Sequence, residues 1–61
     1  MQRHSLLKHL HDQGCRLLRE GKKHSIYWNT GSGNVSAVPR HTEIDNKLAL
    51  KICRDLNIPP P

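Results

Sequence analysis

The chain has 61 residues, which is enough for one small domain with a single hydrophobic core. Ten Lys and Arg residues against five Asp and Glu residues give a formal net charge of +5. This excess indicates either a polyanionic or acidic partner or an ordinary solvated basic surface, and composition alone does not choose between them. No apolar run approaches the roughly 20 residues of a membrane helix, and no apolar signal-peptide segment begins the chain, so we expect a cytoplasmic protein without a membrane partner.

The cysteines and histidines do not form a recognisable metal motif. Cys15 and Cys53 are far apart in the sequence, which excludes a CxxC motif, and we expect two buried thiols in a reducing compartment. His4 and His11 share a helix face but lie too far apart for one zinc ion, and His9 projects elsewhere. We therefore expect a solvated helix face, no metal and no small-molecule cofactor.

The N-terminal stretch is predicted to form a helix. Ser5 can cap this helix, and Gly14 can end it, because glycine readily adopts the left-handed conformation that often follows a helix. A narrow apolar stripe recurs at helical spacing between these ends and consists of Leu6, Leu7 and Leu10.

Three short strands are expected next. The first is Cys15 to Glu20, where apolar and polar residues alternate imperfectly. The second includes residues 26–28, which form the most β-prone stretch of the chain. Residues 30–34 are typical of a turn, and residues 35–38 alternate again as a third strand. Pro39 should close this strand, because proline cannot donate a hydrogen bond to a sheet ladder.

A second helix is expected after the acidic segment 43–45, because negative charge stabilises a helix N-terminus. Asn57 can end it, Leu48 and Leu50 lie off its apolar face, and that face consists of Ala49, Ile52, Cys53 and Leu56. The result is an α+β domain spanning residues 1–61 in the order helix, three strands, helix. Both helices should pack on one face of a three-stranded antiparallel sheet and leave the other face free for a ligand.

In this order the residues resemble the HicA family of toxins, which are small ribonucleases (mRNA interferases) of type II toxin–antitoxin systems with a dsRBD-like fold. The resemblance covers about residues 6–58, nearly the whole chain. It rests on the leucine helix ending in Gly14, on Arg16-Leu17 and Arg19, on His24-Ser25-Ile26-Tyr27, on Val38-Pro39-Arg40-His41, and on the closing helix through Ile52 to Asn57-Ile58. None of these motifs is specific alone, and their order and spacing in so short a chain carry the match.

The resemblance assigns a role to one histidine. The family pattern is Gly-Ser-His followed by an aromatic residue, with a catalytic histidine, and it places that histidine on His24 and the aromatic on Tyr27. The chain departs from the pattern at Lys22-Lys23, which stand where Gly-Ser is usual, and at Asn57, which replaces a common glycine. The implied function is a toxin that cleaves mRNA to inhibit translation, with a HicB-like antitoxin protein as its partner.

The residues around His24 suit the cleavage of RNA without a metal. The 2′-hydroxyl of RNA can attack the adjacent phosphorus, which requires a proton acceptor and stabilisation of the charge on phosphate. His24 is the candidate general base and acid, because imidazole titrates near neutral pH. The candidate RNA-binding residues are Lys22, Lys23, Arg40, His41, Arg19 and Tyr27.

The aromatic residue that would stack on an RNA base is not fixed by the sequence. Tyr27 and Trp28 are neighbours on a strand, so their side chains point to opposite faces of the sheet. We expect Tyr27 to lie opposite the His24 side chain. The sequence leaves open whether Tyr27 or Trp28 stacks, and whether His41 takes part in catalysis.

Two interpretations without catalysis also remain open. The chain can be a basic module that binds structured RNA by shape, or a protein-interaction module with Leu48 and Leu50 at its contact surface. Without the family resemblance, His24 is most simply a surface histidine at the end of a strand. Loss of its imidazole separates the interpretations, because cleavage requires that group and binding does not.

Overall fold

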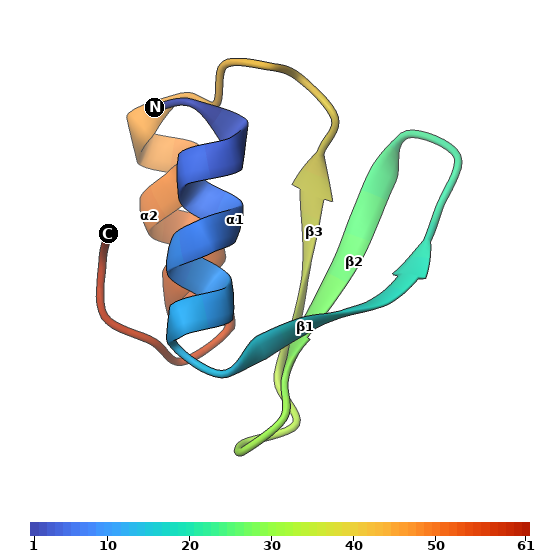
Figure 1. The fold of residues 1–61 in the computed structure, drawn as a ribbon, viewed down its shortest axis with the longest axis vertical. Helices are drawn as coiled ribbons and strands as arrows, with labels where there is room; N and C mark the ends of the chain where they lie inside the picture. Colours follow the sequence, from blue (N-terminus) through green and yellow to red (C-terminus); the bar gives the residue numbers. More distant parts are fainter.

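The computed structural model describes residues 1–61 and has the expected α+β fold (Figure 1). Its elements are α1 (Arg3–Asp12), β1 (Cys15–Glu20), β2 (His24–Asn29), β3 (Val35–Pro39) and α2 (Asn46–Asp55). The strands form one antiparallel sheet in the order β1-β2-β3. Both helices lie on the same side of this sheet, which confirms the predicted architecture (Figure 1).

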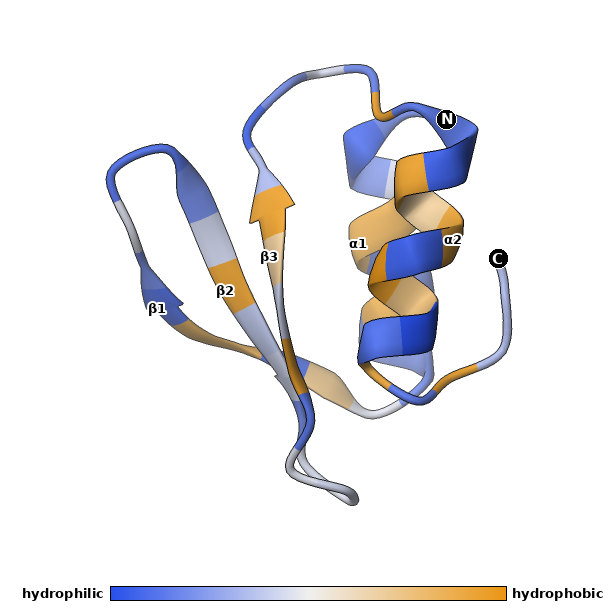
Figure 2. Cartoon of the chain, turned by 180° about the vertical axis from the view of Figure 1, so that it is seen from behind, coloured by the Kyte–Doolittle hydropathy of each residue, from blue (hydrophilic) through white to orange (hydrophobic).

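The hydrophobic core lies between the two helices and the sheet. Figure 2 shows apolar residues gathered around α1, α2 and β3, and hydrophilic residues at the β1–β2 hairpin. The core consists of nine buried residues: Leu6, Leu10, Cys15, Val38, Ile44, Ala49, Ile52, Cys53 and Leu56. It includes the whole predicted apolar face of α2, and both cysteines are buried free thiols as expected.

The start of α1 was predicted wrongly. The helix begins at Arg3, with Gln2 as its N-cap, so Ser5 lies inside the helix and does not cap it. The main-chain oxygen of Gln2 accepts hydrogen bonds from the amides of Ser5 and Leu6, both at 3.1 Å. The loop before α2 fixes this start, because the Arg3 amide donates to the Thr42 carbonyl at 2.8 Å.

The start of α2 lies after the acidic segment rather than within it. The carboxylate of Asp45 caps the helix by accepting a hydrogen bond from the Lys47 amide at 3.1 Å. Glu43 lies earlier, in an isolated β-bridge with Gln2. No acidic residue occupies the first turn of the helix itself.

Both helices end where the sequence predicted. Gly14 follows α1 with φ of 88°, and Asn57 follows α2 with φ of 57°. The Ile58 amide donates to the Cys53 carbonyl and the Asn57 amide to the Arg54 carbonyl, each at 3.0 Å. This pair of bonds is a Schellman motif, which needs a left-handed residue at the position of Asn57.

The alternation of β2 separates two faces of the sheet. Ser25 and Asn29 are buried under the helices, and Tyr27 packs against the core. The intervening residues point to the opposite side, which we call the open face. On β2 these residues are His24, Ile26 and Trp28.

The edge strand β1 contains an irregularity. Its pairing with β2 shifts between Leu17 and Arg19, so Leu18 is an extra residue in the ladder. This bulge explains the imperfect alternation in the sequence of the strand. Arg16 pairs with Trp28, and Arg19 pairs with Ile26.

Candidate active site at the β1–β2 hairpin

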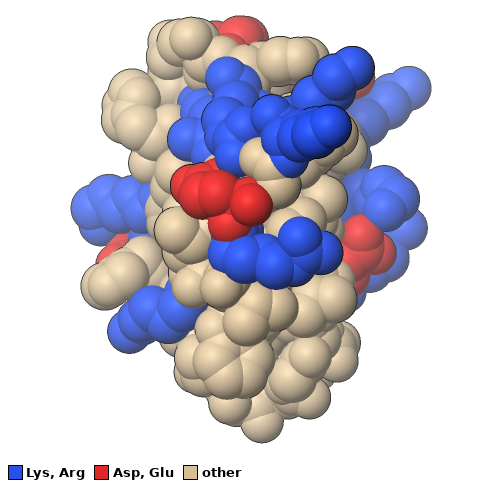
Figure 3. Space-filling view, turned by 90° about the vertical axis from the view of Figure 1, so that its right-hand side faces the viewer, with Lys and Arg blue, Asp and Glu red and all other residues tan.

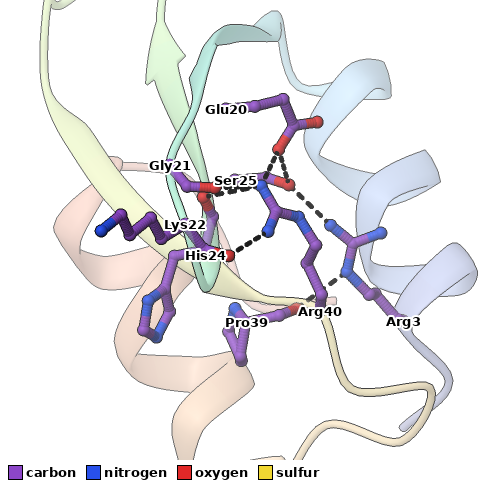
Figure 4. Close-up of polar contacts among 8 residues, drawn as sticks. All are labelled: Arg3, Glu20, Gly21, Lys22, His24, Ser25, Pro39 and Arg40. Carbon is purple, nitrogen blue, oxygen red and sulfur yellow. Dashed lines mark hydrogen bonds and ion pairs between the residues drawn. The ribbon is translucent and has the colours of Figure 1, made fainter.

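His24 is the first residue of β2, at the end of the hairpin, and its side chain is exposed. Its main chain is fixed, because its carbonyl accepts a hydrogen bond from the Gly21 amide at 2.8 Å and its register partner is Pro39. The imidazole makes no hydrogen bond within the chain and points away from the neighbouring ion pair in Figure 4. A fixed backbone with a free imidazole suits a group that must meet a proton on a bound substrate.

The guanidinium of Arg40 closes the hairpin (Figure 4). Its Nη1 donates to the Lys22 carbonyl at 2.8 Å, and its Nη2 donates to Glu20 Oε1 at 2.7 Å. The same Nη2 also contacts the carbonyl of Gly21. The sequence suggested that Arg40 holds phosphate, whereas the structure places its guanidinium against the turn.

The hydrogen bonds that begin at Arg40 and Glu20 continue into the sheet and to α1. Glu20 Oε1 also accepts a hydrogen bond from the Ser25 hydroxyl at 2.7 Å, and Ser25 Oγ accepts one from Arg3 Nη2 at 2.9 Å. Arg3 Nε donates to the Pro39 carbonyl at 2.8 Å. We call Arg40, Glu20, Ser25 and Arg3 the hairpin network, because together they join the hairpin, all three strands and α1.

The hairpin network perturbs one carboxyl group. Hydrogen bonding to Arg40, and secondarily to Ser25, holds the pKa of Glu20 below its ordinary value of 4.5. The carboxylate is therefore ionised at neutral pH and remains paired with Arg40. Sequence reasoning missed Glu20, Ser25 and Arg3, because only the folded chain brings them together.

Four of the predicted RNA-binding residues are exposed, and no intramolecular hydrogen bond or ion pair engages their side chains. They are Lys22, Lys23, Arg19 and His41. The two lysines occupy the connection immediately before His24, and Arg19 lies on the open face opposite Ile26. Figure 3 shows Lys and Arg side chains gathered around a small acidic patch on the hairpin side of the molecule. The two lysines and His24 are thus consecutive residues at the end of the hairpin, and all three are exposed.

The remaining predicted site residues lie apart from this group. His41 follows Arg40 in the loop after β3 and makes no hydrogen bond to the hairpin. Tyr27 packs against the core on the face opposite His24, as expected for its position. The aromatic side chain on the same face as His24 is Trp28.

The histidines of α1 do not converge on a common point. No group of three or more His, Cys, Asp or Glu side chains lies close enough to hold a metal ion. His9 Nε2 instead lies 2.8 Å from the Pro59 carbonyl. Neither helix combines the length and the apolar character needed to cross a membrane.

Comparison of the chain with protein-family models, with curated proteins and with solved structures gave no match. The geometry of the hairpin and the sequence motifs around it are therefore the basis for assigning a function.

Proposed function

We propose that the protein is a cytoplasmic endoribonuclease of the HicA kind, the toxin of a type II toxin–antitoxin system, which cleaves mRNA and so inhibits translation. One observation carries this proposal. The exposed imidazole of His24 lies at the end of a hairpin held by the hairpin network, directly after the unpaired cations of Lys22 and Lys23.

The reaction follows from the chemistry of these groups. Neutral His24 removes the proton from a ribose 2′-hydroxyl, and the oxygen attacks the adjacent phosphorus. The bond from phosphorus to the 5′-oxygen breaks, and the protonated imidazole returns a proton to that oxygen. The products are a 2′,3′-cyclic phosphate and a 5′-hydroxyl. Lys22 and Lys23 stabilise the extra negative charge on the pentavalent phosphate.

The proposed partner is a HicB-like antitoxin that covers the hairpin and occludes His24. An acidic surface on that partner would complement the net charge of +5. The antitoxin and RNA would then compete for the same cations. Binding of either to the folded state also stabilises a small domain.

The alternative function is a basic module that binds RNA or a protein without catalysis. One observation favours it: no second acid or base is hydrogen-bonded to His24. For a protein partner the contact would centre on Leu50, which is 45% exposed and lines two surface pockets. Leu48 contributes less, because it packs partly against the core.

The test is incubation of the purified chain with long single-stranded RNA in EDTA, followed by analysis of the fragment ends. We expect cyclic phosphate ends from the unsubstituted chain and no fragments from His24→Ala. His4→Ala is the matched control, since it removes an exposed imidazole of α1 and should cleave normally. RNA retained but left intact by all three proteins would contradict the enzyme and support the binding module.

A further inference from the structure

The open face of the sheet combines positive charge with apolar groups. The register places Arg16, Trp28 and Val35 in one row across the three strands. Glu20 pairs with Ser25, so its carboxylate belongs to the helix side of the sheet, where Arg40 holds it. No strand residue of the open face is acidic.

Trp28 is the aromatic residue available on this face. It is partly buried but does not pack against the core, whereas Tyr27, the other aromatic residue, does. Its cross-strand neighbour Val35 is 52% exposed. The indole therefore lies on the sheet surface, where part of it meets solvent.

Arg19 is the unpaired cation of this face. Arg16 Nη1 donates to the carbonyls of His11 at 3.1 Å and Cys15 at 2.9 Å, which directs its guanidinium to the end of α1. Arg19 is exposed and has no such partner. In the strand register Arg19 lies opposite Ile26, which is midway along β2 between Trp28 and His24.

We propose that the open face binds single-stranded RNA, with one base stacked on Trp28 and Arg19 holding a phosphate, and that the bound strand continues to His24. Trp28 and His24 lie on the same face about 13 Å apart along the strand, as four residues of extended chain require. Aromatic stacking beside a cation is the chemistry that binds unpaired bases and their backbone. The choice of RNA rests on the proposed function.

Trp28 is the only tryptophan in the chain, so its fluorescence reports directly on this site. The probe is a 2′-O-methyl oligonucleotide of about 12 nucleotides, which cannot be cleaved through its 2′-oxygen. We expect saturable quenching by the single strand and none by the duplex of the same sequence. Binding without a change in fluorescence, or no binding, would overturn the proposal.

Substitution of Arg19 tests the phosphate contact. Arg19→Gln should reduce the slope of log affinity against log salt concentration by about 0.7, the value for one phosphate contact of a single strand. Arg54→Gln is the matched control, because Arg54 is also exposed but lies on α2, on the other side of the molecule. Equal slopes for Arg19→Gln and the unsubstituted chain would contradict the assignment.

Substitution of Trp28 tests the stacking contact with a fluorescently labelled oligonucleotide. Trp28→Leu should bind roughly tenfold more weakly, and Trp28→Phe should recover part of the loss. Unchanged affinity of a folded Trp28→Leu protein would overturn the proposal. Should that variant not fold, the quenching titration of the unsubstituted chain and the Arg19→Gln slope still decide the outcome.

His24→Ala separates this site from the proposed function. The variant should still show saturable quenching, because the stacking residue Trp28 is unchanged. Quenching by the oligonucleotide, with no cleavage of RNA by the unsubstituted chain, would support the open face as a binding site and contradict the proposed ribonuclease activity. The opposite outcome is cleavage that depends on His24, is unaffected by Arg19→Gln and Trp28→Phe, and occurs without quenching by the oligonucleotide. This outcome would contradict the binding site on the open face and leave the proposed function standing.

Discussion

Arg40 holds a hairpin at the position where the sequence motif suggests an RNA contact. Its planar guanidinium donates to the Glu20 carboxylate and to three main-chain carbonyls, those of Gly21, Lys22 and, at 3.4 Å, His24. A lysine ammonium carries the same charge but cannot reproduce this fork of donors. The distinction between charge and geometry is therefore testable at this one residue.

We expect Arg40→Lys to lower the cleavage rate constant several-fold while leaving the salt dependence of RNA binding unchanged. The charge persists, but the main chain at His24 loses its fixed position. Single-turnover kinetics and binding measured over a range of salt concentrations check this expectation. A variant with unchanged cleavage would show that Arg40 acts toward RNA as a point charge.

Glu20 gives the fold a defined dependence on pH. Its pKa is lowered in the folded state, mainly by Arg40, so its contribution is present above the ordinary value of 4.5 and is lost as pH falls through the folded value. The difference in Tm between the unsubstituted chain and Glu20→Gln should therefore shrink on acidification below pH 4.5. Thermal unfolding of both proteins across this range measures it, and a constant difference would contradict the role of the ion pair.

The two cysteines should react slowly with thiol reagents. Burial raises the pKa of both the Cys15 and the Cys53 thiols, which lowers the thiolate fraction, and their exposed fractions are 0% and 1%. We expect labelling by a chromogenic disulfide reagent at mildly alkaline pH to be slow in the folded chain and rapid in urea. Immediate labelling of either thiol under native conditions would contradict the packing of the core.

At the scale of helices, the two N-termini are held by different means. Asp45 caps α2 with its side chain, whereas Gln2 makes no side-chain cap and the start of α1 depends on main-chain bonds to the loop before α2. Asp45→Ala should therefore cost about 1 kcal/mol of unfolding free energy. Ser5→Ala should cost nothing, because Ser5 lies inside the helix. Urea unfolding compares the two, and equal losses would contradict the observed helix starts.

The elements were predictable where one local pattern determines them. The periodic apolar face of α2 and the left-handed residues Gly14 and Asn57 indicated both the packing and the ends of the helices. The start of α1 was not predictable, because a bond to Thr42 sets it. The role of Asn29 was not predictable either, because its buried side chain donates to the carbonyl of Leu56, which is distant in the sequence, at 2.8 Å.

The candidate site was likewise predictable only where local sequence determines it. Lys22, Lys23 and His24 are adjacent in the sequence, so their proximity follows from a short hairpin. The role of Arg40 depends on Glu20 and on Ser25, which lie on different strands. The stacking residue was left open because the choice depends on which face of β2 the helices cover, a fact that only tertiary packing decides.

At the scale of the whole molecule, the distribution of charge explains which cations remain available. All five acidic side chains are engaged within the chain: Asp12, Glu20, Glu43 and Asp55 form ion pairs, and Asp45 caps α2. Exposed pairs of this kind add little stability. Because these five carboxylates are already engaged, they do not compete with a polyanion for the remaining cations of the hairpin and of the open face.

The core is small, because 12 of 61 residues are buried and nine of these form the hydrophobic core. A domain of this size has modest stability, roughly 3 to 5 kcal/mol, so a bound partner would raise its Tm appreciably. We expect saturating 2′-O-methyl oligonucleotide to increase the Tm of the unsubstituted chain, and Arg19→Gln to reduce that increase. Differential scanning calorimetry measures both, and an unchanged Tm at saturating oligonucleotide would contradict binding to the folded state.

The most direct test of the account is the single-turnover rate of RNA cleavage by the unsubstituted chain and by His24→Ala, with binding of the uncleavable oligonucleotide measured in parallel. A general base typically contributes about 10²–10⁴-fold to the rate of a reaction. We therefore expect the cleavage rate of His24→Ala to be at least about 100-fold lower, while its affinity for the oligonucleotide stays the same. A His24→Ala rate close to that of the unsubstituted chain, at equal affinity, would contradict the assignment of catalysis to this imidazole.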